Sequence, residues 1–234
     1  MEPKIPAPEI RVMIADDHHL VRQSIRLQID TQEDMRVIAE AEDGESLFAG
    51  VKAEQPDVLL LDINMPAERG RRFPPFRLFP GIARVQRLSP RTHIIILTQS
   101  DDYAILEGAI QHGVRGYVLK SDDLSLHLPV AVRSVQRAGV YFSESIGPQI
   151  LSRRSQMATL TLTQRQEEVL RAIARYPNRT YAELAAFLNI SESTFKTHLS
   201  RLFKQLEVGN ATAAIIRAIQ VGLLPLEIVY GSDS

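Results

Sequence analysis

The first 140 residues alternate between short apolar runs and longer segments whose apolar residues recur at helical spacing. The runs are too short for helices, and their apolar residues are nearly continuous, as in strands buried on both faces of a sheet. This alternation predicts a parallel sheet covered by helices on both faces. The predicted strands are residues 10–15, 36–41, 58–62, 93–97 and 116–119, and the predicted helices are residues 20–29, 46–53, 102–112 and 125–138, the last with Val130, Val132, Val135 and Ala138 on its apolar side.

From residue 160 onward the helical spacing continues without strands. Thr163 and Gln166 form a capping-box pattern at the start of one helix, and a second helix is predicted over residues 181–188. Asn189 to Ser191 then form a tight turn whose serine is placed to cap a third helix, residues 192–206. Two helices joined in this way predict a helix-turn-helix, which a last helix over residues 210–221 follows.

Two segments interrupt the pattern. Residues 69–81 contain three prolines and three phenylalanines, so no continuous helix can span them. A tolerated surface insertion is the favoured interpretation because loops accept extra length cheaply. The alternative is that exposed Phe and Arg side chains form a contact surface or a lid. Residues 139–158 lack sustained periodicity and predict a hinge with one short helix.

Composition narrows the class of protein. The 234 residues contain no cysteine, which excludes disulfides and thiolate metal sites, and no apolar run is long enough to span a membrane. The N-terminal residues lack the apolar core of a signal peptide, so a cytoplasmic protein is expected. Residues 1–150 hold 17 Lys and Arg against 21 Asp and Glu, whereas residues 151–234 hold 10 against 7. This asymmetry suits an acidic domain joined to one that binds a polyanion.

Polar residues follow four of the predicted strands. Asp16 and Asp17 follow the first strand, Asp62 ends the strand at 58–62, and Thr98 and Lys120 follow the last two. The carboxyl ends of parallel strands meet at one edge, so these side chains are expected to converge. Clustered carboxylates favour a hard divalent cation, most simply Mg²⁺. Asp62 could then accept a phosphoryl group as nucleophile, with Lys120 and the metal stabilising charge and Thr98 hydrogen-bonding one oxygen.

This order of motifs resembles the receiver domain of two-component response regulators over residues 9–140. The resemblance implies a doubly wound, five-stranded parallel sheet with strand order 2-1-3-4-5. It also implies that Asp62 is the phosphoacceptor, that Asp17 binds the metal directly and Asp16 through water, and that the backbone carbonyl of Asn64 is a third ligand. Thr98 and Tyr117 correspond to the switch pair, and Lys120 to the family's conserved cation.

The helix at 192–206 has two contrasting faces. Phe195, Leu199, Leu202 and Leu206 fall within roughly 60° of one another at about 100° per residue, which predicts a buried stripe. The opposite side carries cations and hydroxyls and is expected to hold no acid, as suits a helix that enters a major groove. An ordinary solvated helix face is the alternative. The residues of this opposite side are Lys196, Thr197, Ser200, Arg201 and Lys204.

Residues 162–170 and 190–199 look like the LuxR-type helix-turn-helix of NarL/FixJ response regulators, a resemblance that covers residues 160–222. It implies that Lys196, Thr197 and Ser200 face base edges, while Arg201, Lys204 and Thr194 meet phosphates. In this family the Ala and Ile face of the last helix commonly forms a dimer contact. A two-fold dimer would read a pseudo-palindromic DNA site.

The sequence therefore predicts an α/β receiver domain over residues 1–140, a linker over residues 141–159 and an all-α helix-turn-helix domain over residues 160–234. The predicted function is a transcription regulator, not an enzyme, that a sensor histidine kinase phosphorylates on Asp62 with Mg²⁺ and that binds promoter double-stranded DNA as a homodimer, without a membrane. One rival is a phosphatase-like enzyme with Asp62 as a turnover nucleophile, although position 64 is Asn and not a second acid. The other is an atypical receiver that acts through protein or small-ligand contacts, independently of phosphorylation.

Overall fold

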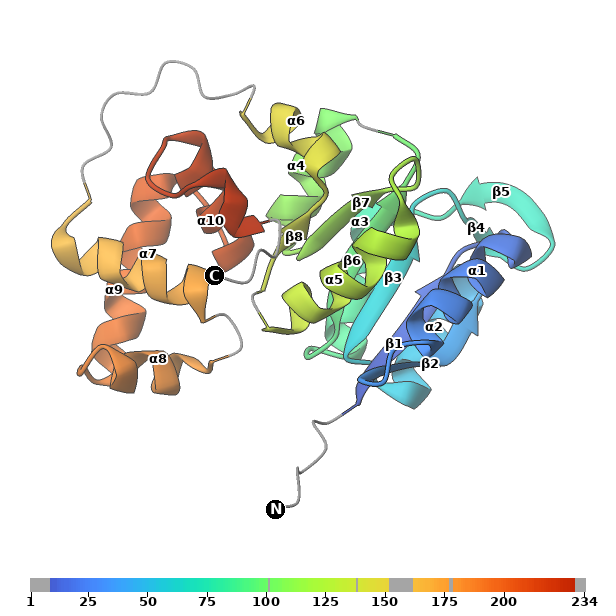
Figure 1. Cartoon of the computed structure of the whole chain (residues 1–234), viewed down its shortest axis with the longest axis horizontal. Coiled ribbons are helices and arrows are strands. Elements are labelled where there is room, and N and C mark those ends of the chain that lie inside the picture. The colour runs from blue at the N-terminus through green and yellow to red at the C-terminus, as the bar shows by residue number, and fades with distance from the viewer. Residues whose placement is uncertain (1–8, 101, 138, 152–161, 177–178, 230–234) are drawn as a thin grey trace.

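The computed structural model describes residues 9–100, 102–137, 139–151, 162–176 and 179–229. Figure 1 shows a sheet with helices on both faces in one half of the molecule and a group of helices in the other. None of the described helices is long and apolar enough to cross a membrane.

The main sheet contains six parallel strands in the order β2-β1-β3-β6-β7-β8. The first five strands in this order match the predicted 2-1-3-4-5 arrangement. The expectation of five strands is wrong by one, because β8 adds a short edge strand beside β7. The strands are β1 (Ile10–Ala15), β2 (Met35–Ala41), β3 (Val58–Asp62), β6 (His93–Thr98), β7 (Gly116–Leu119) and β8 (Tyr141–Phe142).

Five helices cover this sheet, and alternate strand residues supply the two cores. Val12 and Ile14 face the side covered by α1 (His19–Asp30) and α5 (Leu124–Arg137). Met13 and Ala15 face the side covered by α2 (Gly44–Glu54), α3 (Leu78–Leu88) and α4 (Tyr103–Gln111). Burial on both faces explains the continuous apolar runs in the sequence.

Helix α5 differs from its prediction at two positions. Val130 is 38% exposed, so it does not line the apolar side as expected, whereas Val132 and Val135 are fully buried. Ala138 lies outside the described residues. Pro129 lies in the second turn of the helix, where its missing N–H removes one backbone hydrogen bond.

The Phe- and Pro-rich segment contributes a small hairpin and the start of a helix. Strands β4 (Pro66–Glu68) and β5 (Arg71–Pro75) pair antiparallel around Gly70, whose φ of 71° suits a tight turn. Phe76 is buried against Phe48 and donates its backbone N–H to the Met65 carbonyl at 2.8 Å. A continuous helix is absent from 69–81, as predicted, but Phe76 is not the exposed contact residue that the alternative interpretation required.

The first residues of the predicted linker have regular structure. Residues 141–151 form β8, a 3₁₀ turn (Glu144–Ile146) and α6 (Gly147–Leu151), and Ile146 and Ile150 are fully buried. These residues belong to the packed α/β half because their apolar side chains are removed from water. Residues 152–161 lie outside the described part of the chain.

The second half contains the predicted helix-turn-helix. Its helices are α7 (Gln164–Arg175), α8 (Tyr181–Phe187), α9 (Glu192–Leu206) and α10 (Ala211–Gln220), followed by a 3₁₀ turn (Leu226–Val229). Thr163 and Thr180 form capping boxes, and the Ser191 side chain accepts the Thr194 N–H. Asn189, with φ of 55°, makes the turn between α8 and α9. The stripe of Phe195, Leu199, Leu202 and Leu206 is buried as predicted.

The two halves meet where α10 packs against α4 and α6. The Asn210 side chain caps α10 by accepting the Ala213 N–H at 2.9 Å, and its Nδ2 donates to the carbonyls of Ile110 and Gln111 at 3.2 and 3.0 Å. At the other end of α10, Gln220 Nε2 lies 3.4 Å from the Tyr103 hydroxyl. The two helices therefore run antiparallel and are joined near both ends.

Candidate functional site

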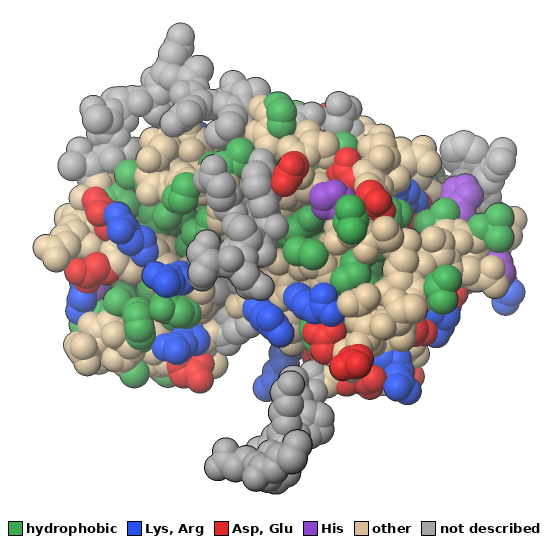
Figure 2. Space-filling model, viewed as in Figure 1, with side chains coloured by type: hydrophobic (Ala, Val, Ile, Leu, Met, Phe, Trp, Pro, Cys, Tyr) green, Lys and Arg blue, Asp and Glu red, His purple; other side chains and the backbone are tan. Residues whose placement is uncertain are grey.

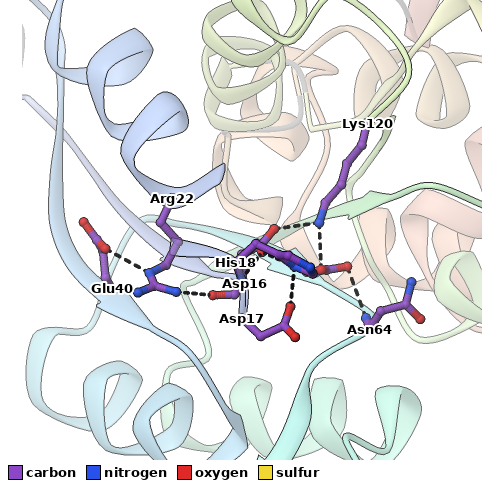
Figure 3. A network of polar contacts seen from close by, with 8 residues as sticks. Asp16, Asp17, His18, Arg22, Glu40, Asn64 and Lys120 are labelled. Atoms are coloured by element: carbon purple, nitrogen blue, oxygen red, sulfur yellow. Dashed lines mark hydrogen bonds and ion pairs between the residues drawn. The ribbon is translucent and has the colours of Figure 1, made fainter. Parts of the chain in front are cut away.

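The carboxyl edge of the main sheet gathers the polar residues that the sequence singled out. Asp16 follows β1, Asp62 ends β3, Thr98 ends β6 and Lys120 follows β7. The register of these parallel strands aligns their ends. Figure 3 shows the carboxylates and the Lys120 ammonium pointing toward one another across the strand ends.

Lys120 bridges two buried carboxylates. Its Nζ donates to Asp16 Oδ2 at 2.6 Å and to Asp62 Oδ2 at 2.7 Å, and both acids are almost completely buried. Burial raises the pKa of Asp62 despite its hydrogen bond with Lys120, and the nearby Asp16 charge adds to this effect. Burial opposes the charge on Lys120 too, but the bonds to Asp16 and Asp62 outweigh it and raise the pKa of the amine. Among the described residues, the Lys120 ammonium therefore joins the two carboxylates of Asp16 and Asp62.

Asp17 extends the acidic cluster toward solvent. Potential ligand atoms of Asp16, Asp17, His18 and Asp62 lie within 4.8 Å of one another. His18 Nδ1 lies 2.7 Å from Asp17 Oδ1, so this histidine contacts the cluster. Three carboxylates against one lysine leave excess negative charge, and oxygen donors in this number fit a hard divalent cation. The Asn64 N–H donates to Asp62 Oδ1 at 3.1 Å, which fixes one carboxylate oxygen.

Arg22 supports the acidic cluster, a role that the sequence pattern did not predict. Its guanidinium is buried and donates to the Asp16 carbonyl at 2.7 Å and to Glu40 at 3.0 Å (Figure 3). The available signal was an arginine that falls three residues before Ile25, on the buried face of α1. Arg22 therefore holds the β1 end in place from behind the carboxylates.

Thr98 and Tyr117 meet at the loop after β6. The Ser100 N–H donates to Thr98 Oγ1 at 3.0 Å, and the Tyr117 hydroxyl donates to the Ser100 carbonyl at 3.2 Å. Both Thr98 and Tyr117 are fully buried. Both residues therefore contact Ser100, which precedes the start of α4 at Tyr103 in the chain.

Helix α9 presents a second candidate site. A shallow depression of about 770 Å³ is lined by Glu192, Ser193, Lys196, Thr197, Ser200 and Arg201. The predicted contact residues Thr194, Lys196, Thr197, Ser200, Arg201 and Lys204 are all exposed.

The expectation that this face carries no acid is wrong. Glu192 lies 2.6 Å from the Lys196 ammonium, one helical turn away. Figure 2 also shows acidic and basic side chains interspersed on the visible face of the helical half. Part of the positive charge of α9 is therefore neutralised within the helix.

Each half of the chain matches a known protein family. Residues 12–128 match the response regulator receiver domain, and residues 160–218 match the luxR family of bacterial regulatory proteins. The uncharacterized transcriptional regulatory protein YhcZ of Bacillus subtilis is 33% identical over 92% of this chain and 97% of its own length. The nitrate/nitrite response regulator NarP of Escherichia coli is 32% identical over 92% and 96%.

A structural relative has the same two-part organisation. RcsB of Salmonella enterica serovar Typhimurium, bound to promoter rprA in the presence of phosphomimetic BeF3-, is 27% identical with a TM-score of 0.54 over 92% of this chain and 100% of that chain. A receiver domain followed by a LuxR-type helix-turn-helix defines a DNA-binding response regulator. The chain belongs to the NarL/FixJ family of these transcription regulators.

Proposed function

We propose that a sensor histidine kinase phosphorylates this regulator on Asp62 and that the modification controls dimerisation and binding to promoter DNA in the cytoplasm. The observation that carries the proposal is the Lys120 bridge between Asp16 and Asp62 at the carboxyl edge of the sheet. Such a cation beside the Asp62 carboxylate suits transfer of a phosphoryl group, because it can neutralise charge on the transferred oxygens.

In the proposed reaction an Asp62 carboxylate oxygen attacks the phosphorus of the donor. The new bond joins this oxygen to phosphorus, the donor's bond to phosphorus breaks, and the leaving group takes a proton. Lys120 neutralises charge on the transferred oxygens, and the Thr98 hydroxyl hydrogen-bonds one of them. The Asn64 N–H holds the second oxygen of Asp62.

Mg²⁺ is the proposed cofactor. Asp17 would bind it directly, Asp16 through water, and the Asp62 carboxylate and Asn64 carbonyl would complete the protein ligands. When bound, the ion supplies positive charge that screens the carboxylates from the incoming phosphoryl group. The fit rests on the clustered carboxylate oxygens and their excess negative charge.

The route from Asp62 to DNA runs through α4. Thr98 and Tyr117 both contact Ser100, whose loop enters α4, and α4 is bonded to α10 through Asn210. We infer that phosphorylation moves Thr98, shifts α4 and releases α10. The apolar residues of α10 then become available for the homodimer contact that the family resemblance implies.

The DNA contacts are assigned to α9. Lys196, Thr197 and Ser200 would face base edges, and Thr194, Arg201 and Lys204 would contact phosphates. Support comes from the exposure of these side chains. It also comes from RcsB, for which a solved structure contains two RcsB dimers bound to two parallel DNAs.

Intact mass after incubation with Mg²⁺ and a small phosphodonor tests the first step. We expect one phosphoryl increment on the natural chain and on the control Asp30→Asn, whose carbonyl oxygen can still accept the Val37 N–H. Asp62→Asn should show none. An unlabelled natural chain that still binds Mg²⁺ would favour the phosphorylation-independent alternative, and continuous release of phosphate from an ester would favour the phosphatase-like one.

A further inference from the structure

A cavity of about 240 Å³ lies between the two halves of the molecule, at the opposite end of the sheet from Asp62. The receiver half contributes Arg115, which precedes β7, and the helical half contributes Arg179, Tyr181 and the first turn of α10. No Asp or Glu lines this cavity among the described residues. Its full lining is Gly113, Arg115, Gly139, Val140, Ile173, Arg179, Tyr181, Leu184, Asn210, Ala211, Thr212 and Ile215.

Arg115 is a half-buried cation without an ionic partner in the described part of the chain. Its side-chain contact is a hydrogen bond to His93 Nε2 at 3.3 Å. Burial, and then the Arg115 charge, lower the pKa of His93 to about 3, so this imidazole is neutral. Its Nε2 accepts the bond because a guanidinium can only donate. Burial also lowers the pKa of Arg115. A desolvated guanidinium in this position gains stability from a counter-ion.

Arg179 adds a second cation on the other side of the cavity. Its guanidinium lies 4.8 Å from the ring centre of Tyr176 and 5.4 Å from that of Phe187. Stacking on two rings limits the positions that the guanidinium can take and leaves its edge available for hydrogen bonds.

The amino end of α10 adds a third source of positive potential. Ala211 and Thr212 occupy its first turn and line the cavity, whereas the Asn210 side chain is used to cap Ala213 and to hold α4. N–H groups in a first helical turn lack helical acceptors and attract anions. Three features from two separate parts of the chain thus create positive potential in one cavity, which half-buried Arg115 and exposed Arg179 both line.

We propose that this cavity binds a compact phosphate-class oxyanion, held by Arg115 from the receiver and by Arg179 and the α10 amino end from the DNA-binding half. The volume equals that of about eight waters at roughly 30 Å³ each, which suits phosphate or pyrophosphate. It is smaller than the roughly 300–1,000 Å³ typical of sites for drug-sized ligands, which favours a compact anion over a nucleotide.

Such an anion would act as a second input to the regulator. It would contact both halves only in the arrangement described here, so binding stabilises that arrangement over any in which α10 is released. The anion would thereby oppose the effect proposed for phosphorylation of Asp62, through residues at the other end of the sheet.

Calorimetric titration of the full, unphosphorylated chain with pyrophosphate tests the proposal. EDTA keeps divalent ions from the Asp62 cluster, so failure of that site cannot affect the result. We expect Arg115→Gln to weaken binding about 10- to 100-fold, because a charge-assisted hydrogen bond contributes about 1.5–3 kcal/mol. Arg179→Gln should weaken it in the same direction.

Three controls make the experiment decisive. Arg87→Gln, at an exposed position of α3, and Arg201→Gln, at an exposed position of α9, should bind pyrophosphate as the natural chain does. Arg115→Lys keeps the charge but not the fork, and should bind more weakly while retaining the native circular dichroism. Equal binding by the natural chain and both Arg115 variants, loss of binding in Arg201→Gln alone, or the same response to potassium chloride at matched ionic strength would overturn the proposal.

Discussion

Replacement of Asn210 by Asp provides a one-atom test of the contact between α4 and α10. Asp keeps the oxygen that caps Ala213 but loses the amide donors to the Ile110 and Gln111 carbonyls. Two neutral hydrogen bonds contribute about 0.5–1.5 kcal/mol each. The bond to Gln111 is exposed, so water replaces it partly, and the expected net loss is about 1–2 kcal/mol. A loss of this size shifts the equilibrium between packed and released α10 at least about fivefold.

Distances between spin labels can measure this shift. The natural chain has no cysteine, so Arg87→Cys on α3 and Arg171→Cys on α7 introduce the only two labelling sites. We expect the unphosphorylated Asn210→Asp protein to populate a second, broader distance distribution and to form dimers at lower concentration. Thr163→Asp is the matched control because it adds the same charge at another N-cap, that of α7.

The reasoning fails if Asn210→Asp has the same distance distribution and the same dimerisation constant as the natural chain. The two bonds to α4 would then contribute nothing to domain packing. Equal changes in Thr163→Asp would attribute the effect to added negative charge instead.

Two further predictions concern α9 and the buried histidine. Lys196→Ala should weaken specific DNA binding by about 1–3 kcal/mol. Glu192→Gln should strengthen DNA binding because it frees Lys196 from an ion pair. Fluorescence anisotropy at fixed salt measures both affinities, and unchanged values would contradict the assignment of α9 to DNA contact. The pKa of His93 is about 3 in the folded protein against 6.5 for an exposed histidine. As pH falls, the unfolded chain therefore takes up a proton before the folded chain does, and the free energy of unfolding declines below pH 6.5. Between pH 7 and 5 the natural chain should lose about 2 kcal/mol more than His93→Gln. Parallel melting temperatures of the two proteins over this range would refute the shift.

The convergence of Asp16, Asp62 and Lys120 could be predicted because it depends on a general property of parallel sheets. Each strand was visible as an apolar run, and the carboxyl ends of such strands meet at one edge. The buried stripe of α9 was equally predictable from helical spacing. In both cases a short-range pattern determines which way a side chain points.

Features that depend on contacts between distant segments were not predictable. Strand β8 has only Tyr141 and Phe142, too few residues to show a period, and is defined by its pairing with β7. The packing of α10 on α4 could not be predicted, because the apolar residues on almost all sides of α10 indicate burial but do not identify the partner. Glu192 could have been placed on the side of α9 that is predicted to face DNA, since it lies four residues before Lys196.

The bond between Lys120 and Asp16 joins residues 104 positions apart in the chain. During synthesis, a nascent chain that ends at α4 already contains every acid of the cluster but lacks the lysine that neutralises it. Pairing of this kind forms late because the ends of a long loop must first be brought together. The phosphorylation proposed for Asp62 would therefore require translation of the receiver half past β7, and a shorter ribosome-bound fragment would not be modified.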